Sequence, residues 1–106
     1  MDKKKVMTYL DELLQDEKFR IRFEAEYQKL LISEKIAKLR KESNLSQEKL
    51  AKRIHTTKSA ISRYESGAYK GYTVTLLNKI AQACNAKLEI TFKQQPAKVK
   101  TRLASA

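Results

Sequence analysis

The sequence has few of the residues that interrupt regular structure or that carry metal and nucleophile chemistry. Its 106 residues include two glycines, one proline, one cysteine, one histidine and no tryptophan. So little glycine and proline favours helices over a sandwich or barrel with many tight turns. One cysteine cannot form an internal disulfide, and a single histidine without neighbouring cysteines gives no zinc-binding pattern. We therefore expect a mainly α-helical chain, without a metal or other cofactor, in a reducing cytoplasm.

Long apolar runs are also missing. No stretch approaches the roughly 20 residues of a membrane span, and the chain does not open with a signal-peptide pattern. Paired carboxylates occur at 11–12, 16–17 and 24/26, but no histidine or glycine-rich loop accompanies them. A catalytic site is therefore not indicated. We expect a cytoplasmic protein that is not an enzyme and has no membrane partner.

Positive charge is abundant but unevenly distributed, and the formal net charge is +11. Residues 1–32 hold seven basic and seven acidic side chains, and residues 33–93 hold thirteen basic against five acidic. Residues 94–106 add three basic side chains and no acid. We therefore divide the chain into an N-terminal extension, a basic domain and a basic tail expected to be disordered. A balanced part beside a basic part suggests two surfaces with different partners, although a basic face can also be merely solvated.

The N-terminal extension is predicted to be helical. Four aliphatic residues at helical spacing form an amphipathic stripe over 1–15: Val6, Leu10, Leu13 and Leu14. Asp16 is a suitable N-cap for a second helix. This helix carries a second stripe: Phe19, Phe23, Tyr27, Leu30 and Leu31. Because residues 17–43 contain neither glycine nor proline, we expect one helix that continues to about residue 42, with a break at Ser33 as the alternative.

Residues 45–67, LSQEKLAKRIHTTKSAISRYESG, predict two short helices joined by a tight bend. Ser46 opens the first helix and Thr57 the second, after a bend at 55–56. The apolar residues of both helices turn toward one interior: Leu50, Ala51, Ile54, Ile61 and Tyr64. The small Ala51 sits where the helices cross most closely, and Gly67 suits a left-handed cap. This pattern predicts a helix-turn-helix.

These residues resemble the helix-turn-helix of phage repressors, Cro proteins and the wider XRE-type regulators. The resemblance implies a lambda-repressor-like bundle in which Gln47 opens the first helix against a phosphate and the second helix faces the major groove. His55 stands where the family usually has glycine, so we expect a slightly strained turn.

We assign eight residues to a surface that binds double-stranded operator DNA: Gln47, Thr57, Lys58, Ser59, Ser62, Arg63, Lys70 and Tyr72. Arg63 and Lys58 are the best candidates for reading guanine O6 and N7, whereas Gln47 and Lys70 position the protein on phosphates. Glu65 is expected to be structural, paired with a nearby cation or backbone amide.

The remainder of the basic domain predicts a helix and a strand. Thr73 caps a helix whose apolar face includes Cys84, expected to be a small core residue. Residues 87–93, KLEITFK, alternate apolar and polar side chains, which is typical of one C-terminal β-strand. A lone strand cannot satisfy its own backbone, so we expect it to pair with its copy in a second subunit or with a partner protein.

The layout as a whole resembles an antitoxin of the HigA type, from bacterial toxin–antitoxin operons. The resemblance implies a homodimer that represses its own operon and neutralises a small mRNA-cleaving toxin. Six residues of the extension are candidate toxin anchors: Tyr9, Leu10, Leu13, Leu14, Phe19 and Phe23. The aromatic stripe of the extension could instead pack onto the helix-turn-helix as extra core: Tyr9, Phe19, Phe23 and Tyr27. A stand-alone phage-type repressor and an RNA-binding protein remain the alternatives.

Overall fold

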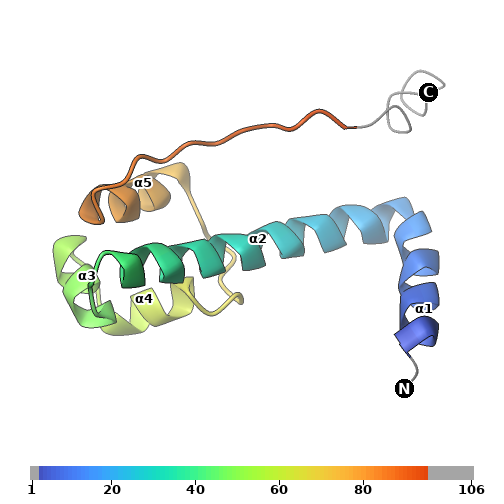
Figure 1. Cartoon of the computed structure of the whole chain (residues 1–106), viewed down its shortest axis with the longest axis horizontal. Helices are drawn as coiled ribbons and strands as arrows, with labels where there is room; N and C mark the ends of the chain where they lie inside the picture. The colour runs from blue at the N-terminus through green and yellow to red at the C-terminus, as the bar shows by residue number, and fades with distance from the viewer. Residues whose placement is uncertain (1–2, 96–106) are drawn as a thin grey trace.

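The computed structural model describes residues 3–95, which form five helices joined by short connections (Figure 1). They are α1 (Lys3–Gln15), α2 (Glu17–Glu42), α3 (Gln47–Arg53), α4 (Lys58–Tyr64) and α5 (Val74–Ala83). The prediction of a mainly helical chain with a helix-turn-helix is confirmed. The tail predicted to be disordered spans 94–106, and its residues 96–106 lie outside the described part of the chain. None of the helices in 3–95 combines the length and apolarity needed to cross a membrane.

Helix α2 is the axis of the molecule (Figure 1). It begins at the predicted N-cap, where Asp16 Oδ1 accepts a hydrogen bond from the Phe19 amide at 3.1 Å. It continues through Ser33, which is 1% exposed and donates from Oγ to the Leu30 carbonyl at 2.7 Å. The prediction of one unbroken helix is therefore confirmed. Its 26 residues span about 39 Å, and the boundary drawn at residue 32 falls inside it.

The core lies at the C-terminal end of α2, where α3, α4 and α5 gather (Figure 1). Leu50 and Ile61 are 0% exposed, and Ile80 is 1% exposed. Cys84 is buried beside them, as predicted for a small core residue. Helices α3 and α4 have only seven residues each, and isolated helices of this length are not stable in water. Burial of their apolar side chains in this core stabilises them.

The connections between helices follow the cap chemistry of the sequence. The hydroxyls of Ser46, Thr57 and Thr73 each accept the backbone amide three residues onward, at 3.0 to 3.1 Å. Gly67 has φ +83°, a conformation that favours glycine, and a Cβ there would lie 3.0 Å from Leu30 Cδ1, so the leucine side chain would have to shift slightly. His55 has φ 59°, the strained turn that the sequence predicts.

An ion pair inside the core joins α2 to the end of α4. Arg40 donates from Nε to Glu65 Oε2 at 2.6 Å and from a terminal nitrogen to Oε1 at 3.0 Å. Its other terminal nitrogen donates to the Leu45 carbonyl at 2.9 Å, and Gln47 Nε2 donates to Glu65 Oε1 at 3.0 Å. The Arg40 and Glu65 side chains are 10% and 8% exposed. The prediction that Glu65 is structural and pairs with a cation is confirmed.

The N-terminal extension projects away from this core. Helix α1 lies across the far end of α2 and makes a corner with it (Figure 1). The radius of gyration is 17.8 Å, against about 13 Å expected for a compact chain of this length. Tyr27 is 50% exposed and Phe23 is 38% exposed, so this part of the stripe is not buried against the helix-turn-helix.

The β-strand predicted for 87–93 is not present in the part of the chain that the structure describes, so the structure of a single chain does not support this prediction. After α5 the chain runs back alongside α2 as an extended segment (Figure 1). Alternation of side chains specifies two faces, but a strand exists only where a second backbone supplies hydrogen-bond partners. No other described segment supplies one, because the remainder of residues 3–95 is helices and short loops.

Replacing Glu65 by glutamine tests the buried ion pair. Burial raises the pKa of the Glu65 carboxyl, but hydrogen bonds from Arg40 and Gln47 and the charge of Arg40 lower it by more, so it lies below its ordinary value of 4.5. The ionised Glu65 therefore contributes its full stabilisation of the fold above about pH 4.5, its ordinary pKa. This contribution is lost as the pH falls through the lower pKa that Glu65 has in the folded chain. Glu65→Gln should lower the free energy of unfolding by about 3 kcal/mol at pH 7, because Arg40 is left unpaired. The loss should be much smaller in acid, because the Glu65 carboxyl of the wild type is then protonated as well.

The measurement is urea unfolding followed by circular dichroism at pH 7 and at pH 3. Glu48→Gln is the matched control, since its carboxylate lies 3.9 Å from Lys52 and is 67% exposed. It should change the free energy of unfolding by less than about 0.5 kcal/mol. Equal losses for both variants at pH 7 would contradict the role given to Glu65.

Candidate nucleic-acid interface

Helices α3 and α4 cross closely because small residues line their contact. Ala51 is 2% exposed and Ala60 is 4% exposed, and neither has a side chain that would hold the helices apart. The turn between them is closed by the Thr56 amide, which donates to the Ala51 carbonyl at 2.8 Å. The left-handed His55 lets the chain reverse within three residues. Together these features fix the angle at which α4 leaves the core.

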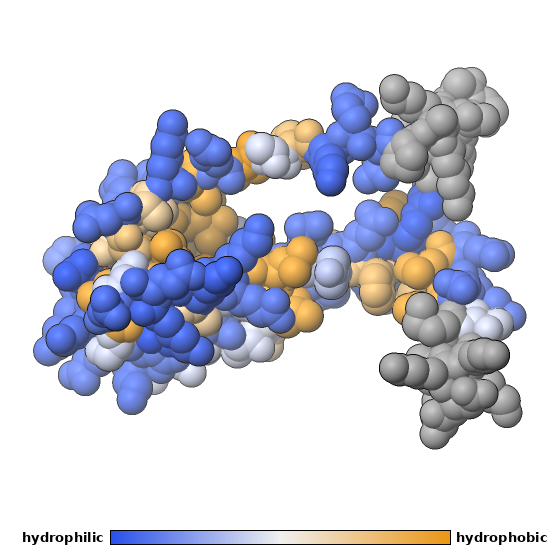
Figure 2. Space-filling model, viewed as in Figure 1, coloured by the Kyte–Doolittle hydropathy of each residue, from blue (hydrophilic) through white to orange (hydrophobic). Residues whose placement is uncertain are grey.

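The outer face of α4 is polar and open to solvent. Ala60 and Ile61 point into the core, whereas five of the predicted DNA-binding residues are exposed: Thr57, Lys58, Ser59, Ser62 and Arg63. Hydrophilic residues cover this end of the molecule in Figure 2. The side chains on this face can donate to phosphates and base edges, and an α-helix of this width fits the major groove of duplex DNA.

Two predicted contacts already have partners within the protein. Thr57 Oγ1 accepts from the Ala60 amide at 3.1 Å, so this side chain caps α4. Gln47 is half-buried, and its Nε2 donates to Glu65. A primary amide nitrogen carries two hydrogens, so Gln47 retains one donor for a phosphate. Its predicted role is therefore compatible with its place in the buried network.

The loop after α4 is held by three tyrosines. Tyr69 packs edge-to-face against Tyr64 and Tyr72, with ring centroids 4.9 Å apart in both pairs. The Tyr72 hydroxyl donates to the Tyr64 carbonyl at 2.6 Å, and burial raises the pKa of Tyr72, which keeps this donor protonated. In the free chain this hydrogen bond holds the loop against α4, and the DNA contact assigned to Tyr72 stays a prediction. Lys70 is exposed at the tip of this loop, as its predicted role requires.

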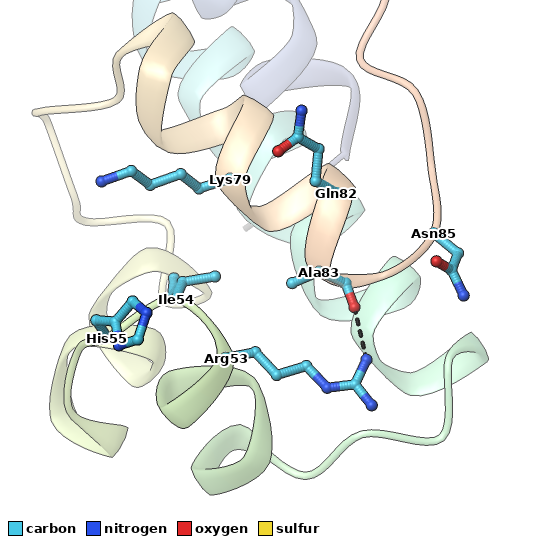
Figure 3. Close-up of a pocket in the computed structure, with 7 residues that line it drawn as sticks. All are labelled: Arg53, Ile54, His55, Lys79, Gln82, Ala83 and Asn85. Atoms are coloured by element: carbon cyan, nitrogen blue, oxygen red, sulfur yellow. Dashed lines mark hydrogen bonds between the residues drawn. The ribbon is translucent and has the colours of Figure 1, made fainter.

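A surface pocket of about 550 Å³ lies beside the turn that follows α3, between the end of α3 and α5 (Figure 3). Arg53 reaches across to donate to the Ala83 carbonyl at 2.8 Å and so ties the two helices together. Lys79 and His55 also line the pocket, and no acidic residue does. The pocket therefore extends the positive surface around the helix-turn-helix. No group of metal-ligating side chains comes together anywhere in 3–95.

The predicted anchors of the extension fall into two groups. Leu10, Leu13, Leu14 and Phe19 are half-buried, on the two helices that meet at the corner. Tyr9 and Phe23 are exposed. Phe23 stacks with Phe19 on one side and with Tyr27 on the other, with ring centroids 6.1 and 6.4 Å apart. The structure thus brings Phe19 and Phe23 together in an aromatic row that Tyr27 extends.

Two residues that position the site, Arg40 and Tyr69, are not among those predicted from the sequence. Arg40 occupies the fourth position after the buried Ile36, on the apolar stripe of α2, and a charged residue in that register is a signal that it has a buried partner. Tyr69 gave no such signal, because its contacts depend on how the loop folds back over α4.

The exposed α4, its steep crossing with α3 and the cationic surroundings define a helix-turn-helix DNA-binding module. The chain belongs to the helix-turn-helix family, which matches residues 36–90. It is therefore a DNA-binding protein of the kind that regulates transcription, a class whose members are typically not enzymes. Comparison with curated proteins gives no match, and comparison with solved structures gives none.

Two alanine variants separate base reading from phosphate contact. Arg63→Ala should reduce discrimination between operator and mismatched duplex by about 1–3 kcal/mol, because a bidentate contact to a base edge is lost. Lys70→Ala should weaken binding to both duplexes by a similar factor and lower the slope of log affinity against log salt by about 1. Fluorescence anisotropy titrations at several salt concentrations measure both quantities. Unchanged discrimination in Arg63→Ala would show that this side chain does not read bases.

Proposed function

We propose that the chain is an antitoxin: a homodimer that represses its own operon by binding operator DNA and neutralises a small mRNA-cleaving toxin with its N-terminal extension. The observation that carries the toxin-binding half is the exposed aromatic row on the projecting part of α2. A repressor that needs only its helix-turn-helix does not require a projecting helix with exposed apolar side chains.

The extension exposes more large apolar side chains than the rest of the described chain. Among residues 8–95, whose side-chain exposure is described, eight large hydrophobic residues are exposed, and five of them belong to the extension: Tyr9, Ile21, Phe23, Tyr27 and Leu30. Soluble monomers rarely leave neighbouring apolar groups uncovered, and such patches mark protein-binding sites. Aromatic side chains supply much of the binding energy in known interfaces. The row is therefore suited to a protein partner.

Charge supports the same partner class. Four carboxylates at the corner of α1 and α2 are exposed: Asp11, Glu12, Asp16 and Glu17. A protein that cleaves RNA needs cationic side chains to hold phosphates, so an acidic rim would speed its capture. Covering that cationic surface would at the same time exclude RNA from it.

Repression requires two recognition helices on one duplex. A dimer presents them about 34 Å apart, one turn of B-DNA, to a palindromic operator. The positive surface around α4 then contributes affinity that falls steeply with salt, as lysine and arginine displace counterions. Bound at its promoter, the dimer would block transcription of its own operon.

The double substitution Phe23→Ala/Tyr27→Ala tests toxin capture. Co-expression with the product of the adjacent small gene, followed by pull-down and a growth assay, should show that the wild-type chain binds this protein and rescues growth. The variant should weaken binding at least about 30-fold, as expected for loss of two central aromatic side chains. Val74→Ala is the matched control, because Val74 is 61% exposed but lies on α5. Both variants should bind operator DNA like the wild type.

Failure to capture the adjacent gene product would remove the antitoxin half and leave a stand-alone repressor. Competition between operator duplex and structured RNA addresses the remaining alternative. The basic surface is an RNA-binding surface if structured RNA displaces the duplex and Arg63→Ala changes the affinities for RNA and for duplex DNA by the same factor.

A further inference from the structure

The extended segment after α5 has an unused backbone. Residues 87–95 make no backbone hydrogen bond to any other described residue. The segment runs beside α2 but is separated from it by an open space (Figures 1 and 2). An extended chain with free amides and carbonyls on both edges is a template for pairing with another strand.

The segment is also apolar on one face. Phe92 is 99% exposed and Ile90 is 59% exposed, while Leu88 is half-buried. A groove of about 490 Å³ separates the segment from α2 and α5. Its apolar lining includes Ile32, Ile36, Leu77, Leu88 and Ile90. A phenylalanine left fully in water beside such a groove indicates a surface that is covered in the working protein.

We propose that the covering partner is the same segment of a second copy, paired antiparallel with Thr91 on the two-fold axis. In this register Ile90 lies opposite the partner's Phe92, and Phe92 opposite the partner's Ile90. On the other face, Glu89 lies opposite the partner's Lys93, and Lys93 opposite the partner's Glu89. Each dimer thus gains two apolar cross-strand pairs and two ion pairs. The partner's apolar side chains fall on the face that borders the groove.

Neighbouring registers are less favourable. An axis at Ile90 places Lys87 opposite the partner's Lys93, and an axis at Glu89 places two carboxylates opposite each other. An axis at Leu88 would pair Lys87 with the partner's Glu89, but it leaves the most exposed aromatic ring outside the paired region. A slip of one strand by one residue would place its apolar side chains on the same face of the sheet as the polar side chains of the other strand. Only the axis at Thr91 combines opposite charges with full pairing of the exposed apolar residues.

This assignment gives the dimer of the proposed repressor an interface, and in that respect it deepens the proposed function. It leaves both the outer face of α4 and the aromatic row on α2 available, since it uses neither. Self-association is measurable without DNA or toxin, so its failure is distinguishable from failure of the antitoxin proposal.

A charge exchange on the full chain tests both the surface and the register. Glu89→Lys places lysines opposite each other, and Lys93→Glu places glutamates opposite each other. Each should weaken dimerisation about tenfold or more at low salt, because two attractive pairs become repulsive. The double variant Glu89→Lys/Lys93→Glu restores opposite charges and should dimerise within about threefold of the wild type. Sedimentation equilibrium gives the dissociation constants.

Lys87→Glu is the matched control on the same segment. With the axis at Thr91, Lys87 faces the partner's Gln95, so this variant should dimerise like the wild type. With the axis at Leu88 it would face the partner's Glu89 and weaken the dimer. The segment lies outside the five helices, so far-UV circular dichroism should be unchanged in all variants.

Phe92→Ala should also weaken the dimer at least tenfold by removing both apolar pairs. A monomeric wild-type chain would overturn the proposal, as would single charge variants that dimerise normally. A double variant as weak as either single variant would overturn the register.

Discussion

The buried pair of Arg40 and Glu65 sets the geometry on which both surfaces of this protein depend. Arg40 belongs to the long α2, and Glu65 caps the C-terminal end of α4, so the pair holds the exposed helix against the molecule's axis. Gln47 joins from the first turn of α3. Three helices therefore meet at one carboxylate, and the angle of α4 relative to α2 cannot change without separating buried charges.

Such a pair contributes specificity of arrangement more than net stability, because removing two charges from water costs about as much as their attraction returns. Stability comes from the apolar contacts of Leu50, Ile61 and Ile80, which would tolerate several packings of similar free energy. The ion pair selects one of them. The aromatic row lies on α2, and the ion pair joins α4 to the same helix. Their relative orientation is therefore fixed when the core forms. The two surfaces then act at opposite ends of one helix.

The features predictable from the sequence are those determined by local chemistry. Asp16, Ser46, Thr57 and Thr73 each cap a helix because the bond runs to an amide three residues away. The continuity of α2 follows from the lack of glycine and proline. The partner of Glu65, by contrast, lies 25 residues away, and no local pattern names it. The strand predicted for 87–93 is absent from a single chain because alternation describes two faces and cannot supply the second backbone that a strand needs. The hydrogen bond from the Tyr72 hydroxyl to the Tyr64 carbonyl was likewise not predictable, because it depends on how the loop folds back.

We infer that DNA contacts α4 and the loop after it, while the N-terminal extension stays free for another partner. Amide chemical shifts of the ¹⁵N-labelled chain, recorded before and after addition of a duplex from its own promoter, test this directly. Large shift changes are expected at residues 57–63 and around Lys70, and the shifts of residues 9–31 should not change. Changes concentrated in the extension, with α4 unaffected, would contradict it.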